Sequence, residues 1–197
     1  FYRMKQHPDH KGPGSMALLR DALELYYTKG YNADRSLNEI FRQHRLRDER
    51  MRADLANRLY GIIRFRRPIV TAIGDERISS IDDIKLLVDT LNKWKKIYKG
   101  EQPSGKEDGV MQKLKKYSRI RIMRESMPDI LDKEGVKQLG EEKWTEVAAQ
   151  LNRDPHLFIR VNTIKAQKQQ VKQLLEEGGI KFSDVDGGEE ALMAEKF

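Results

Sequence analysis

Apolar residues recur along most of the chain at the three- and four-residue spacing of amphipathic helices. The pattern predicts a first helix from Ala17, which Gly30 ends. It predicts a second helix that Ser36 caps and a third that Asp48 caps, because Ser and Asp side chains accept hydrogen bonds from free N–H groups at a helix start.

The same period continues beyond the third helix. Pro68 is expected to open a short helix. A longer helix is predicted over residues 81–98, then a polar loop over about 99–109, and a helix or helix pair from Val110 to Met123. Up to residue 125 the pattern therefore predicts only helices.

The period changes after Pro155. Alternating apolar residues predict a strand over 157–161, an amphipathic helix follows over about 166–177, and a second strand is expected over 180–184. Gly178 and Gly179 are expected to stop the helix. This strand–helix–strand pattern is typical of a small α/β domain.

The expected fold is mainly α, with a small α/β domain at the C-terminal end that is incomplete. Residues 1–16 are interpreted as a tail or a segment derived from an expression vector. Residues 17–125 form the predicted helical domain, 126–150 a helical linker, and 151–197 the small α/β domain.

Composition narrows the class of protein. The chain contains 35% charged and 38% hydrophobic residues and no cysteine, which excludes disulfides, thiolate metal sites and cysteine nucleophiles. No apolar run reaches the roughly 20 residues that span a bilayer, and no signal peptide is visible. We therefore expect a cytoplasmic protein without a membrane partner.

The net charge of +7 is uneven along the chain. Residues 1–100 carry 21 Lys and Arg against 13 Asp and Glu, a net of +8, whereas residues 101–197 carry 17 against 18, a net of −1. A polyanionic partner is thus expected for the first half.

A run from Arg35 to Arg67 holds ten arginines and four acids. Arginine suits RNA because its planar guanidinium binds phosphate through two hydrogen bonds and stacks on bases. The alternative is a solvated helix surface with ion pairs four residues apart, such as Asp54 with Arg58. The candidate RNA-binding residues in this run are Arg45, Arg47, Arg64, Arg66 and Arg67.

A second basic run, KLKKYSRIRIMR, has six basic residues and no acid. Phosphate contacts with one stacking ring, Tyr117, fit it, as does a helix whose basic side is merely solvated. Its candidate RNA-binding residues are Lys113, Lys115, Lys116, Arg119 and Arg121.

Two polar residues, Arg160 and Asn162, follow alternate positions of the first predicted strand and so share a face with Phe158. Arg160 is a further RNA-binding candidate. Asn162 equally suits a turn before the helix.

Two phrases resemble a known family. LNRDPHLFIRVNTIK, followed by QQVKQLLEEGGI, is similar to the segment before the catalytic domain of the Sun/Fmu-type RNA cytosine-C5 methyltransferases. DERMRADLANRLYGIIRFRRPI resembles the NusB-like domain that leads many of them. The resemblance implies a NusB-like helical domain, a small RNA-recognition-like domain, S-adenosylmethionine as the cofactor of the parent protein, and two catalytic cysteines.

This chain contains none of those cysteines and no Gly-rich cofactor turn. The resemblance therefore implies a part that binds ribosomal RNA and positions it for a C-terminal methyltransferase domain outside this chain, with no cofactor of its own. The alternative is a NusB-like protein-interaction module with no direct RNA contact. A free-standing antitermination factor fits less well, because of the strand–helix–strand tail.

Overall fold

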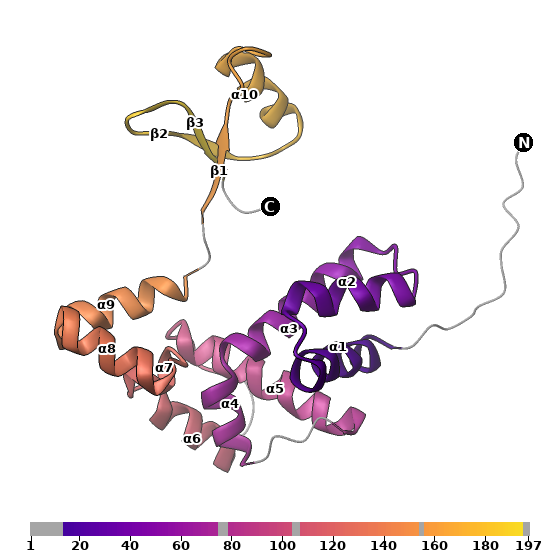
Figure 1. Cartoon of the computed structure of the whole chain (residues 1–197), viewed down its shortest axis with the longest axis vertical. Coiled ribbons are helices and arrows are strands. Elements are labelled where there is room, and N and C mark those ends of the chain that lie inside the picture. Colours follow the sequence, from indigo (N-terminus) through magenta and orange to yellow (C-terminus); the bar gives the residue numbers. More distant parts are fainter. Residues whose placement is uncertain (1–13, 75–78, 104–106, 154–155, 195–197) are drawn as a thin grey trace, which may run out of the picture. The chain divides into compact units, whose positions relative to one another are not determined.

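The computed structural model of the chain describes residues 14–74, 79–103, 107–153 and 156–194 (Figure 1). These residues are mainly helical, with a three-stranded antiparallel sheet near the C-terminal end, which confirms the expected fold class. The chain divides into two compact units, Phe1–Leu151 and Asn152–Phe197. Most of the expected tail lies outside the described residues, but Ser15 and Met16 already belong to the first helix.

The first unit, here the helical unit, contains nine helices in its described residues. They are α1 (Ser15–Lys29), α2 (Ala33–Gln43), α3 (Glu49–Arg64), α4 (Arg66–Ile73), α5 (Ile81–Tyr98), α6 (Gly109–Tyr117), α7 (Arg121–Arg124), α8 (Asp129–Leu139) and α9 (Glu141–Leu151).

Side-chain caps set several of these helix starts. Asp48 accepts hydrogen bonds from the backbone N–H groups of Arg50 and Met51 at 2.9 and 3.1 Å, which confirms its predicted role before α3. The prediction for Ser36 is wrong, since α2 begins three residues earlier, where the Asn32 side chain accepts from the Arg35 N–H at 2.8 Å. Asparagine caps a helix as well as serine does, and here it comes first along the chain.

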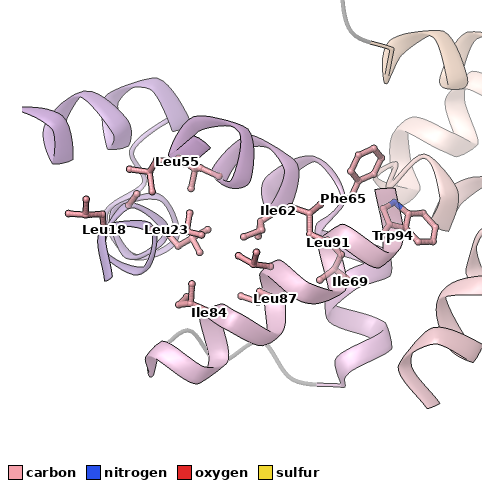
Figure 2. Close-up of a cluster of buried hydrophobic side chains, with 14 of the residues drawn as sticks. Leu18, Leu23, Leu55, Ile62, Phe65, Ile69, Ile84, Leu87, Leu91 and Trp94 are labelled. Carbon is pink, nitrogen blue, oxygen red and sulfur yellow. The ribbon is translucent and has the colours of Figure 1, made fainter. Parts of the chain in front are cut away.

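The main core lies where α1, α3, α4 and α5 meet (Figure 2). Leu18, Leu55, Ile84 and Trp94 are almost completely buried in it. Gly61 lets α3 approach α5, because a Cβ at that position would lie 2.8 Å from the Cδ2 of Leu91. Burial of such side chains is the main stabilising contribution to this unit.

A smaller core joins α8 and α9, the segment expected to be a linker. It consists of Met127, Trp144 and Ala148. The Trp144 ring lies on Gly135, where an added Cβ would be 2.2 Å from the ring atom Cδ2. Glycine is therefore required here for space.

The second unit contains β1 (Leu157–Arg160), α10 (Lys168–Glu177), β2 (Phe182–Val185) and β3 (Gly188–Ala194). The expected strand, helix and strand are present, with bounds shifted by one or two residues. A third strand was not predicted: β3 lies between β1 and β2 and is antiparallel to both. Gly187, at a φ of 72°, occupies the turn that leads into it.

Candidate functional site

The basic residues predicted to bind RNA lie at four places. These are the loop between α2 and α3, the junction of α3 and α4, the α6–α7 segment, and strand β1. In that order they are Arg45 and Arg47; Arg64, Arg66 and Arg67; Lys113, Lys115, Lys116, Arg119 and Arg121; and Arg160.

The second and third places are neighbours, because α4 packs on α6 (Figure 1). The Nζ of Lys113 donates to the Ala72 carbonyl of α4 at 3.2 Å. The first place lies at the opposite end of α3, whose 16 residues extend over about 24 Å. The predicted residues of the helical unit therefore do not form one continuous patch.

Arg67 has a structural role. Its guanidinium donates to the Met127 carbonyl at 2.7 Å and to the Asp129 carboxylate at 2.8 Å, and its backbone N–H donates to Ser126 Oγ at 3.2 Å. The sequence around it lacks an acid, but the fold supplies Asp129 from α8. Arg67 thus attaches the start of α4 to the start of α8.

Arg121 has the most complete set of partners among the predicted residues. Its Nε and Nη2 each donate to the Asp132 carboxylate at 3.0 Å, and it also pairs with Glu141 and Thr145. Hydrogen bonds from Arg121 hold the pKa of Asp132 below its ordinary value, and the Trp144 indole N–H, 2.8 Å away, adds to this effect. The Arg121 side chain is only 14% exposed, so its charge serves the α7–α9 packing.

Further predicted residues make other interactions within the chain. Lys115 pairs with Glu107 at 2.9 Å, and Arg160 lies 3.5 Å from Glu190. Arg66 lies over the ring of Tyr27, with its Cζ 5.4 Å from the centroid. Arg64 also takes part in an intramolecular interaction. The exposed ion pairs of Lys115 and Arg160 are weak enough to exchange for a phosphate.

Four predicted residues are exposed, and their side chains make no hydrogen bond, ion pair or ring contact with the part of the chain that the structure describes: Arg45, Arg47, Lys116 and Arg119. Arg45 and Arg47 flank Leu46, whose half-buried side chain packs on the main core. Anchoring of Leu46 directs its two neighbours outward. This pair is the clearest concentration of available positive charge among the predicted residues.

Residues 44–50, here the α2–α3 corner, have two further features. Arg45 has a φ of 48°, a left-handed conformation that is uncommon for arginine and often marks a functional position. Arg50 is exposed, and its side chain likewise makes no hydrogen bond, ion pair or ring contact with the described residues, although it was not among the predicted site residues. Arg50 follows two acids, Asp48 and Glu49, so its sequence neighbourhood suggested an ion pair. In the structure the Asp48 carboxylate instead caps α3 through backbone N–H groups.

A shallow cavity of about 410 Å³ lies beside the start of α4. Arg66 and Arg67 line it together with apolar side chains and the 126–128 segment. The Arg67 guanidinium at this cavity is already bound to the Met127 carbonyl and to the Asp129 carboxylate, so the cavity is not a strong candidate for an anion site.

The described residues offer few features for other chemistry. They contain no group of three or more His, Asp or Glu residues arranged to hold a metal ion. No helix in the described ranges is both long and apolar enough to cross a membrane. What the basic groups can do chemically is bind phosphate and stack on planar rings.

Comparison with known proteins adds information on the C-terminal part. Residues 127–197 match a family model described as "Methyltr_RsmF/B-like, ferredoxin-like domain". For this part of the chain, the match agrees at a coarse level with the methyltransferase resemblance of the RVNT segment. It does not extend to residues 17–125, for which the NusB-like resemblance stays a prediction.

A solved structure titled "Crystal Structure of PH0851" is similar over 93% of this chain and 48% of its own, with 17% sequence identity and a TM-score of 0.48. The chain thus spans about half the length of that protein. No curated protein sequence matches the chain.

Proposed function

We propose that this chain is the RNA-binding part of a methyltransferase that modifies a cytosine of ribosomal RNA at C5. The observation that carries the proposal is the match of residues 127–197 to a domain of RsmF/B-like methyltransferases. S-adenosylmethionine and the cysteine chemistry would then belong to a separate methyltransferase domain, since this chain has no cysteine.

Five exposed cations of the helical unit, which have no ion pair among the described residues, are proposed to contact the RNA backbone. Arg45, Arg47 and Arg50 at the α2–α3 corner would bind phosphates through charge-assisted hydrogen bonds. Lys116 and Arg119 would do so near the junction of α6 and α7. Arg67 and Arg121 are expected to contribute little, because their donors already bind carboxylates and carbonyls of the chain.

The salt dependence of binding can show whether only these five cations or all eleven predicted residues contact phosphates. The logarithm of affinity for a single strand falls with the logarithm of salt concentration at a slope of about −0.7 per phosphate contact. Five cations give a slope of about −3.5, and all eleven predicted residues would give about −7.7. Micromolar affinity at low salt and a loss of roughly 100-fold between 50 and 200 mM salt are expected.

The test is fluorescence anisotropy with a labelled ribosomal RNA fragment and the full chain. The double variant Arg45→Glu/Arg47→Glu should lower affinity on the order of tenfold or more, because two phosphate contacts become repulsive. The matched control is Lys85→Glu/Lys143→Glu, which changes the net charge equally at exposed lysines that pair with Asp82 and Glu146. Equal loss in both variants would refute a role for the α2–α3 corner beyond its net charge.

A protein-interaction module is the second candidate. It is favoured by three exposed apolar side chains of α8, Ile130, Leu131 and Leu139, of which Ile130 is 80% exposed. Absence of RNA binding at low salt would reject the first proposal and favour this one.

A further inference from the structure

The three-stranded sheet of the second unit has one covered and one open face. Cross-strand partners share a face, and Leu192 of β3 is paired with Asp184 of β2. Lys168 and Lys172 of α10 both bind the Asp184 carboxylate at 2.8 Å, so α10 lies on this side of the sheet. Leu192 is completely buried there.

The opposite face carries a row of one aromatic, one apolar and one small polar side chain across the three strands. Phe158 of β1 is paired with Met193 of β3, which is paired with Ser183 of β2. With strands about 4.8 Å apart, the row extends over about 10 Å, enough for a nucleobase to lie flat. Phe158 is 58% exposed, so its ring is accessible from solvent.

Polar groups flank the ring along β1. His156, Phe158 and Arg160 occupy alternate positions and therefore project to the same side. The His156 and Phe158 rings lie edge to face with centroids 6.3 Å apart, which supports this for His156. The Arg160 side chain is 87% exposed and lies about 7 Å further along the strand.

The only described partner of the Arg160 guanidinium is Glu190, with Nε 3.5 Å from Oε2. A solvent-exposed pair of this geometry contributes little, so an RNA phosphate can replace the carboxylate. The ring is thus flanked by an imidazole and by a guanidinium whose carboxylate partner can be replaced. A protein-binding surface would instead be broad and apolar. This order of groups fits a stacked base with phosphates on either side.

We propose that the open sheet face is a stacking platform for one unpaired base of single-stranded RNA, with Phe158 beneath the base and Arg160 on an adjacent phosphate. The inference rests on the proposed function, because it assigns a base-binding role to an RNA-binding chain. Stacking on a phenyl ring tolerates any base, so the platform recognises an unpaired nucleotide and not a particular sequence. The aromatic residue was not among the predicted site residues, although its alternation with Arg160 was visible in the sequence.

The test uses the full chain and a short single-stranded RNA that carries one 2-aminopurine, whose fluorescence is quenched when the base stacks. Phe158→Ala and Phe158→Leu should each weaken binding about tenfold and reduce the quenching. Phe158→Tyr should retain both, because it keeps the ring. Since the Phe158 side chain is largely exposed, these changes should leave the circular dichroism spectrum unchanged.

The matched control is Leu174→Ala. Leu174 is an apolar residue of α10, on the other side of the sheet, and its side chain is 66% exposed. Unchanged affinity and quenching in Phe158→Ala and Phe158→Leu, with RNA still bound by the wild type, would overturn the platform and leave the proposed function intact. Equal losses in Leu174→Ala would also overturn the platform. Failure of the wild type to bind RNA at low salt would reject the proposed function itself, together with the platform.

Discussion

Replacement of Asp132 by asparagine is expected to loosen the α7–α9 packing while preserving its shape. The carboxylate accepts two hydrogen bonds from Arg121 at 3.0 Å and one from the Trp144 indole at 2.8 Å. Asparagine keeps one acceptor oxygen but removes the charge. Its amide group would place hydrogen-bond donors opposite the donors of Arg121.

The magnitude follows from burial. The Arg121 and Asp132 side chains are 14% and 12% exposed, so loss of the Asp132 charge leaves a largely desolvated guanidinium whose remaining partners are Thr145 and the exposed Glu141. Breaking a buried pair costs about 3–5 kcal/mol. Because asparagine retains one acceptor, we expect a loss of about 3 kcal/mol, or a decrease in melting temperature of roughly 6–12 °C for a chain of this size.

The matched control is Asp129→Asn on the same helix. Asp129 also binds an arginine, Arg67, at 2.8 Å, but its side chain is 66% exposed. An exposed pair contributes less than about 1 kcal/mol. The two variants therefore compare a buried carboxylate that accepts three hydrogen bonds with an exposed carboxylate that accepts one from Arg67.

Urea unfolding followed by tryptophan fluorescence measures both variants. The two tryptophans, Trp94 and Trp144, lie in the helical unit, so the signal reports on that unit alone. If Asp132→Asn were no more destabilising than Asp129→Asn, the Arg121–Asp132 pair would not organise this packing.

The pH dependence of stability tests the Arg121–Asp132 pair in a second way. The pKa of Asp132 is lowered in the folded state, chiefly by the hydrogen bonds from Arg121. Its contribution is complete above the unfolded pKa of about 3.9 and is lost as pH falls through the lower folded pKa. The difference in stability between wild type and Asp132→Asn should therefore shrink below about pH 4.

Two further predictions concern other packed groups. Gly135→Ala should destabilise the helical unit by about 1–3 kcal/mol in thermal unfolding, because the new Cβ meets the Trp144 ring. Gly109→Ala, with no atom within 4 Å of its added Cβ, should change stability by less than about 1 kcal/mol. Tyr60 donates a hydrogen bond to Asp34, which raises the pKa of its phenol to about 12, so its ultraviolet titration should be delayed. Because the folded pKa exceeds the unfolded value of about 10, this stabilisation should be lost as pH rises from about 10 to 12, and Tyr60→Phe should abolish that loss.

Local patterns were enough to predict most of the helices. Helix α5 begins and ends at the predicted residues, Ile81 and Tyr98, because Ser80 and Asp83 form a capping box directly before a regular apolar face. Strand β3 was missed because Glu189–Ala194 contains residues that favour helices. It is a strand because it pairs with β1 and β2 on both sides, and such distant pairing is invisible in a local pattern.

The candidate site shows the same division between local and distant contacts. Sequence reasoning considered ion pairs between residues four positions apart, but Arg67 binds an aspartate 62 positions away. Arg121 binds Asp132 and Glu141 from two other helices. A count of basic residues therefore overestimates the charge available to RNA, whereas the arginines of the α2–α3 corner make no ion pair among the described residues.

The α8–α9 segment lies between two boundaries in the chain, the start of the family match and the border between the two compact units. The family match begins at residue 127, whereas the compact units divide after Leu151. The ion pairs of Asp129 with Arg67 and of Asp132 with Arg121 join α8 to residues that precede the match. A fragment of residues 127–197 would lack Arg121, the partner of Asp132. The Asp132 carboxylate would then be unpaired and partly desolvated, which destabilises the fragment. The arrangement of α8 therefore depends in part on Arg67 and Arg121, which precede the matched residues.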